Sequence, residues 1–451
     1  MRVWPIVLVA ACGSSPKPLP TWDKSLPDSS AMGTWRGLVP ARGIVHLHSP
    51  YSHDACDNMP RDAQGVPNEP CLQDLREALC ADHIDFAALT DHDDTMADED
   101  FATLFSMRDG DAPVLDGSGA QIASRMTCDD GHQVTITVGG ETDIMPVMLH
   151  RHVPGDVQQR HDTYNAVDLT AMQAFRDAGG LAWIAHTEQH DIAQLRALQP
   201  DGLEVYNLHA NIDPNIRSTY LGLDSAGAIQ AAANFADTNP GHPEPDLALL
   251  SFMQPNQPAI DRWNQVLADG RHVPATAGSD AHENALPIML ADGERGDSYR
   301  RVLRWFSNVV LVTDPQDPAQ VEAALAKGRL FAVFELLGTP EGLDIHAGGG
   351  ELGDTVPVGT TLEVAIPHVR NLDKSLPAPT IVATVYRIDA SGPTMVASGS
   401  DNLTVPMTSA GAYRVEITMV PHHLGPYLAD LGTAAAEQTV PWIYASPIYA
   451  Q

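Results

Sequence analysis

Between about residues 43 and 335, short apolar segments alternate with longer amphipathic segments. The short segments predict buried strands, at 43–46, 86–90, 134–138, 181–185, 203–206 and 274–277. The amphipathic segments predict helices, at 72–81, 170–178, 259–269 and 319–327, and a glycine follows each of the last three. Buried strands that alternate with helices are typical of a parallel sheet, either open or closed into a barrel.

The pattern changes after about residue 338, where helical periodicity is nearly absent. Alternating or β-branched segments predict short strands, at 361–366, 380–386, 402–405 and 413–418. Short strands at this spacing favour a small antiparallel β-sandwich over residues 338–451.

Residues 1–12 have the character of a signal peptide. The apolar run at 3–11 is too short to cross a bilayer core of about 30 Å, and its end resembles a bacterial lipobox, in which Cys12 would be acylated. An ordinary secretory signal is the alternative. The Ser- and Pro-rich segment 13–37 predicts a flexible tether. We therefore expect a bacterial cell-envelope protein, at the periplasmic side of the outer membrane or the cell surface, that meets the membrane only through acylated Cys12.

The other cysteines fit an exported chain, because Cys56, Cys71, Cys80 and Cys128 are an even number that can form two disulfides. Three pairings are open. The pair Cys56–Cys71 is favoured because it flanks a loop rich in Pro and Asn. The cysteine spacing lacks the CxxC pattern of a structural zinc site.

The net charge of the chain argues against some classes of binding partner. The 451 residues include 26 Lys and Arg against 58 Asp and Glu, a formal net charge of −32. Such a chain repels phosphate backbones, which argues against a nucleic-acid partner. A phosphorylated substrate would need a local positive centre.

Several predicted strands end beside residues that can bind metal. His46 and His48 are two apart, so in an extended segment both face the same side. Similar residues follow other strands: His53, Asp54, Asp91, His92, Asp93, Glu141, His150, His152, His186, Asp280 and His282. Sites in parallel α/β folds form at these carboxyl ends. Imidazoles mixed with carboxylates favour Zn, Mn or Fe.

These motifs occur in a recognisable order: HxH at 46–48, TDHD at 90–93, GxE at 139–141, His186, GLEVYN at 202–207 and GSDAH at 278–282. Together they resemble the PHP (polymerase and histidinol phosphatase) family over roughly residues 43–335. The resemblance implies a distorted seven-stranded (β/α) barrel over 38–337, a cluster of two or three divalent metal ions, and hydrolysis of phosphoesters. The chain end at 441–449 looks like that of the secreted CehA-type subgroup.

The resemblance also implies ligands for two of the metals. His46, His48, Glu141 and Asp280 would hold the first metal. Glu141 would bridge to a second, completed by His186 and by either His150 or His152, with His152 favoured. Glu141, Asp280 and His186 would form the catalytic core.

A third metal would take His92, His282 and one residue of the pair His53 and Asp54. The chain has Ser52-His53-Asp54 where many family members have Ser-Asp-Gly, and His53 is the favoured ligand. Glu204, Tyr206 and Asn207 lie on a strand where a pocket-lining role and a structural role are equally expected.

These expectations favour a metal-dependent phosphoesterase that acts on a small-molecule, lipid or sugar mono- or diester through a metal-activated hydroxide. Arg61, Arg151 and Arg217 are candidates to hold phosphate. One alternative is a carboxyl-ester or amide hydrolase of the CehA type, and another is a non-catalytic binding module. The oligomeric state stays open.

Overall fold

The computed structural model describes residues 19–431 and 433–451. The strands up to residue 333 are β1 (Val39–Ile44), β2 (Phe86–Leu89), β3 (Ala112–Leu115), β4 (Gln121–Thr127), β5 (Gln133–Val138), β6 (Ile144–Val147), β7 (Leu181–Ile184), β8 (Gly202–Asn207), β9 (Ala275–Gly278), β10 (Ser307–Val312) and β11 (Leu330–Val333). Each of the six strands predicted in this region overlaps one of them.

The α-helices of this region are α1 (Ala55–Asn58), α2 (Glu69–Ala81), α3 (Asp93–Met96), α4 (Val157–Tyr164), α5 (Leu169–Asp177), α6 (Ile192–Leu198), α7 (Leu208–Ile212), α8 (Pro214–Thr219), α9 (Ser225–Ala233), α10 (Gln257–Ala268), α11 (Tyr299–Leu303) and α12 (Pro318–Lys327). The four predicted helices correspond to α2, α5, α10 and α12. Helix α2 begins where the Asn68 side chain accepts a hydrogen bond from Cys71 N, and α12 ends at Gly328 in the left-handed conformation.

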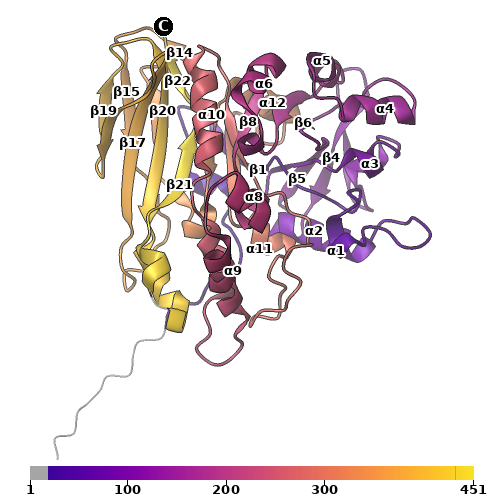
Figure 1. The fold of residues 1–451 in the computed structure, drawn as a ribbon, viewed down its shortest axis with the longest axis horizontal. Helices are drawn as coiled ribbons and strands as arrows, with labels where there is room; N and C mark the ends of the chain where they lie inside the picture. Colours follow the sequence, from indigo (N-terminus) through magenta and orange to yellow (C-terminus); the bar gives the residue numbers. More distant parts are fainter. Residues whose placement is uncertain (1–18, 432) are drawn as a thin grey trace, which may run out of the picture.

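The later strands are β12 (Pro340–Glu341), β13 (Asp344–Ala347), β14 (Thr355–Val356), β15 (Thr361–Ala365), β16 (His368–Val369), β17 (Thr380–Asp389), β18 (Gly392–Gly399), β19 (Leu403–Pro406), β20 (Gly411–Val420), β21 (Val440–Ala445) and β22 (Ile448–Ala450). Figure 1 shows these strands, in orange and yellow, as a layer beside α10. Trp263 of α10 packs under the Arg414 guanidinium of β20 at 4.9 Å, which joins the helix to this layer.

A mixed sheet of thirteen strands runs through both regions, in the order β14-β22-β20-β21-β11-β10-β1-β2-β5-β4-β3, with β17 beside β20 and β18 beside β17. Strand β21 pairs antiparallel with β11, so the sheet continues across residue 338. Strands β13, β15 and β19 form a separate three-stranded sheet. The structure is therefore mixed α/β with one large sheet.

The strands expected to close a barrel form parts of two sheets. Strands β1, β2 and β5 pair in parallel within the large sheet, while β6-β7-β8-β9 form the second. The two sheets touch at both edges, where Leu149 N donates to Val138 O (2.7 Å) and His48 N donates to Ala281 O (3.1 Å). A second backbone hydrogen bond lies at each edge, from Gly140 N to Pro146 O (2.9 Å) and from Asp280 N to His46 O (3.1 Å). These few contacts replace strand ladders, so the described residues do not show one continuous barrel.

The N-terminal prediction meets the structure only in part. Residues 1–18, with the expected signal peptide and Cys12, lie outside the described residues. Residues 19–37 pack on the body and do not form a free tether: Leu26 and Trp35 are buried, and Trp22 Nε1 donates to Asp246 at 2.7 Å. The physical reason is that this segment carries large apolar side chains that gain from burial.

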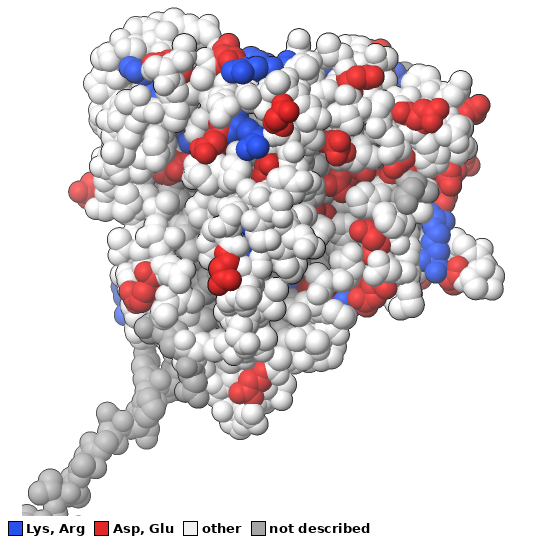
Figure 2. Space-filling view, viewed as in Figure 1, with Lys and Arg blue, Asp and Glu red and all other residues white. Residues whose placement is uncertain are grey.

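Two disulfides, Cys56–Cys71 and Cys80–Cys128, confirm the favoured pairing. Both have one cysteine in α2, so that helix is fixed at each end. Figure 2 shows acidic side chains more widely spread than basic ones over one face, as the net charge implies. Within the described ranges, no helix combines the length and apolar character needed to span a bilayer.

Candidate metal centre

Four buried side chains converge just beyond strands β1, β5 and β9. The Nε2 atoms of His46 and His48 lie 3.2 Å apart. The Glu141 carboxylate lies 3.3 Å from His46 Nε2 and 3.2 Å from His48 Nε2, and Asp280 Oδ1 lies 3.4 and 3.3 Å from the same nitrogens. Their donor atoms are close enough together to bind one cation.

A second group shares Asp280. Its Oδ2 atom lies 3.2 Å from His186 Nε2 and 3.2 Å from His209 Nδ1. Glu141 also reaches His186, at 3.4 Å, and so faces both groups. His209 was missing from the predicted ligands, although it lies two residues after the end of the GLEVYN strand, and residues just beyond strand ends are the ones that were predicted as ligands.

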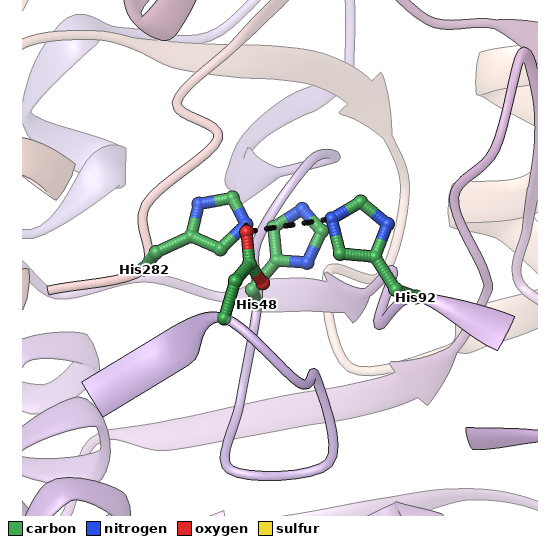
Figure 3. A group of neighbouring side chains, drawn as sticks. His48, His92 and His282 are labelled. Carbon is green, nitrogen blue, oxygen red and sulfur yellow. Dashed lines mark ion pairs between the residues drawn. The ribbon is translucent and has the colours of Figure 1, made fainter. Parts of the chain in front are cut away.

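The third group is His48, His92, His282 and Asp54. Figure 3 shows its three imidazoles turned toward one another. Asp54 Oδ2 lies 3.3 Å from His282 Nε2 and 3.7 Å from His92 Nε2. The favoured His53 lies outside this group: its exposed ring packs on His92 with centroids 5.1 Å apart. The structure thus brings the alternative residue, Asp54, into the group.

His150 and His152 are not brought into any of the three groups. His150 Nε2 lies 3.1 Å from Glu322 Oε2. The two ring nitrogens of His152 contact the Tyr164 hydroxyl at 3.1 Å and the Glu99 carbonyl at 2.9 Å. The place expected for one of them beside His186 is taken by His209.

Outer hydrogen bonds orient the ligand residues. Glu204 accepts from His46 Nδ1 at 2.9 Å, from His186 N at 3.0 Å and from Asn207 Nδ2 at 2.9 Å. On the other side, Ser52 Oγ lies 2.9 Å from His48 Nδ1. With Nδ1 engaged in this way, the Nε2 atoms of His46 and His48 point into the centre. Glu204 and Asn207 therefore have a role at the site, whereas Tyr206 is buried and donates to Phe252 O.

Two left-handed residues shape the backbone here. His186 has φ 44° and Asp280 has φ 52°, a region that residues other than glycine rarely occupy. Backbone strain of this kind concentrates at functional sites.

The electrostatics favour ionised carboxylates. Burial opposes ionisation, but the His46 charge and hydrogen bonds from His186 keep the pKa of Glu141 and of Asp280 well below their ordinary values. Burial would lower the pKa of His46, yet Asp280 and Glu141 raise it well above its ordinary value. Burial, together with the His48 charge, lowers the pKa of His282 to about 3, so this imidazole is neutral and can offer a lone pair.

The site fits divalent ions on its own chemistry. Asp280 Oδ1 and His282 Nε2 are buried and have no hydrogen-bond partner among the described residues. Burying polar atoms that make no hydrogen bond is costly, and a cation would satisfy both. Imidazoles and carboxylates without thiolates suit Zn, Mn or Fe.

A fourth acidic group, Asp246, Asp292 and Glu294, is different. Arg300 lies 2.6 Å from Asp246, and Lys24 lies 2.6 Å from Asp292, so these carboxylates already have cationic partners. We interpret this group as an ion-pair network.

The three arginines considered for phosphate binding also have other partners. Arg61 pairs with Glu99 at 2.7 Å. Arg217 is buried and donates to Asn211 O at 2.9 Å, and Arg151 donates to the Asp177 carbonyl.

Comparisons with known proteins add little to this geometry. No protein-family model and no curated protein matches the sequence. A two-domain protein from Bacteroides vulgatus, described as containing a predicted PHP-like metal-dependent phosphoesterase, is similar at 12% identity over 96% of this chain and 100% of its own, with a TM-score of 0.34. PsfC from Pseudomonas syringae is similar at 12% identity over 60% of this chain and 82% of its own, with a TM-score of 0.31. Similarity this low supports no argument about fold or activity, so the function of this chain has to be inferred from its own residues.

Proposed function

We propose that this chain is a metal-dependent hydrolase of the PHP type, most simply a phosphoesterase. The observation that carries the proposal is the sharing of ligands: His48 and Asp280 each belong to two of the three groups, and Glu141 faces all three. Ligand groups that share carboxylates would hold two or three ions close together, which is the arrangement used for in-line hydrolysis.

The chain's residues divide into three sets of ligands. His46, His48, Glu141 and Asp280 would hold one ion, His186, His209 and Asp280 a second, and Asp54, His92 and His282 a third. His48 also lies beside the third set, but its one free ring nitrogen, Nε2, can bind a single ion. Bound ions would supply Lewis acidity and lower the pKa of water in the site. Glu141 and Asp280 stay ionised and keep the ions together, while Glu204 and Ser52 hold the imidazoles in place.

The bond that is cleaved is best tested directly. The purified protein would be analysed for Zn, Mn and Fe and assayed on nitrophenyl phosphate, bis(nitrophenyl) phosphate and nitrophenyl carboxylates. We expect at least one ion per chain and turnover of a phosphoester that Glu141→Ala abolishes together with metal retention. Turnover of carboxylates alone would favour the ester or amide hydrolase, and absence of both metal and turnover would favour a binding module.

A cell-envelope location belongs to the same proposal. The sequence of residues 1–12 supports export and acylation at Cys12, and the two disulfides are typical of an oxidising compartment. Metabolic labelling with a palmitate analogue, lost in Cys12→Ala, would test the anchor.

A further inference from the structure

A cavity of about 370 Å³ opens beside the candidate metal centre. His209, Asp280 and His282 form one side of it. Apolar side chains from α7, α9 and the segment after α9 form much of the rest: Leu208, Ile212, Ile229, Ala232, Leu249 and Phe252. The same space is therefore bounded by ligand residues at one side and by hydrocarbon at the other.

The ionisable side chains that line this cavity are histidines and acids. Apart from the histidines, its ionisable lining residues are Asp280, Glu283 and Asp297, and none of the described lining residues is Lys or Arg. The arginines nearest in sequence to the motif loops are engaged elsewhere. Arg295 pairs with Asp297 at 2.7 Å but does not line the cavity itself. A second phosphate or a carboxylate on the substrate would therefore find no Lys or Arg among the described lining residues.

The rim of the cavity is apolar as well. Ile229 and Ile288 both line it, and they are 43% and 38% exposed. Partly exposed, large apolar side chains that line a cavity next to a polar centre favour an apolar ligand group that enters from solvent.

We propose that the substrate carries an uncharged apolar group, alkyl or aryl, which binds in this cavity while the scissile bond lies at the metal centre. The position of the scissile bond at the metal centre rests on the proposed function, whereas binding of an apolar group in the cavity does not. Ala232, on α9, has a half-buried side chain in the wall, so a larger residue there would extend into the cavity.

The test compares wild type with Ala232→Phe and with a matched control, Ala226→Phe. Ala226 lies on the same helix, is exposed, and is not a lining residue of the cavity. One measurement follows binding of n-hexanol by saturation-transfer NMR, without added metal. The other compares hexylphosphonate with methylphosphonate by calorimetry on the manganese-loaded protein.

Each fully buried methylene contributes about fourfold to affinity, so hexylphosphonate should bind at least about tenfold tighter than methylphosphonate. Ala232→Phe should remove this ratio and the n-hexanol signal, and Ala226→Phe should keep both. An absent n-hexanol signal in wild type, or one retained in Ala232→Phe, would overturn the cavity's role even in an active hydrolase. A chain-length ratio near one would do the same. If n-hexanol binds as expected but neither phosphonate binds and no ester is hydrolysed, the proposed function fails and the apolar site stands.

Discussion

His209 Nδ1 and Asp280 Oδ2 lie 3.2 Å apart, and the same oxygen lies 3.2 Å from His186 Nε2. The other oxygen of Asp280 faces His46 and His48. One carboxylate thus joins two groups, and His209 completes the second. Its side chain is 45% exposed and borders the apolar cavity, so it is the ligand residue most open to a substrate.

Replacing His209 should remove a metal without unfolding the protein, because the side chain is half exposed. In His209→Gln we expect about one ion fewer per chain and turnover reduced by at least about 100-fold. Replacing a residue that only supports a metal ligand reduces activity by up to about 100-fold, and loss of a ligand should cost at least as much. Elemental analysis and turnover of the best nitrophenyl substrate measure this. His150→Gln is the control, since His150 pairs with Glu322 outside the groups. Unchanged metal content in His209→Gln would exclude His209 from the centre.

Glu204 supports two histidines at once, and its replacement should weaken metal binding without removing a ligand. The Glu204 carboxylate accepts hydrogen bonds from His46 Nδ1, His186 N and Asn207 Nδ2. In Glu204→Gln the amide NH₂ is itself a donor, so at least one of these hydrogen bonds would be lost. We expect metal affinity to fall by about 10- to 100-fold. Competition with a chromogenic chelator measures this, with Glu322→Gln as the matched control. Equal affinities in the two variants would contradict the orienting role.

The sequence predicted the elements and most of the centre because both follow local rules. Burial patterns identified β1, β2, β5, β7, β8 and β9, and ligand residues at the ends of such strands meet in space. His46, His48, Glu141 and Asp280 are brought together in this way.

What could not be predicted depends on short loops. Whether His53 or Asp54 faces inward is decided by the turn that comes after them, where Cys56, Asp57 and Asn58 all have positive φ. No periodicity encodes that turn, and adjacent residues point in different directions. His209 was not predicted because the family resemblance favours the histidines after β6, whereas α7 places His209 over Asp280. The expected barrel is not confirmed for a similar reason, because the few hydrogen bonds that join the two sheets involve loop residues beyond the strand ends.

The Cys56–Cys71 disulfide is anchored two residues after Asp54, in the same loop. Cys56 N donates to His282 O at 2.8 Å, and Asn284 Nδ2 donates to Asp54 O at 2.9 Å, so the loop carrying Asp54 is fastened to the loop carrying His282. The disulfide fixes this loop to α2.

Removing that disulfide should affect both stability and the third group. For Cys56→Ala/Cys71→Ala, closing a loop of 15 residues predicts a loss of about 3 kcal/mol, with weaker binding of one ion because Asp54 is less well held. Cys80→Ala/Cys128→Ala should lose about 4 kcal/mol for its separation of 48 residues but keep its metal. Urea unfolding and elemental analysis of both variants measure this. Equal metal content in the two would show that the loop holds Asp54 unaided.

His423 gives a pH dependence that is independent of the metal centre. It is buried, its Nε2 donates to Leu337 O at 3.0 Å, and its Nδ1 has no hydrogen-bond partner among the described residues. Protonation would place a second, unpaired N–H in the interior. Burial therefore lowers the pKa of His423 from 6.5 to about 4.

The consequence is a loss of stability in mild acid. Below pH 6.5, His423 is protonated in the unfolded chain, whereas in the folded chain it stays neutral down to its pKa of about 4. The free energy of unfolding should therefore fall as the pH falls from 6.5 to about 4, by about 3 kcal/mol in all. His423→Gln should remove this contribution, because its amide can still donate to Leu337 O and does not titrate. Urea midpoints at several pH values between these limits measure the slope. His422→Gln is the matched control, since the neighbouring His422 is partly exposed and lies 3.0 Å from Glu437. If His423→Gln declines as steeply as wild type and the control, the acid sensitivity of this protein arises elsewhere.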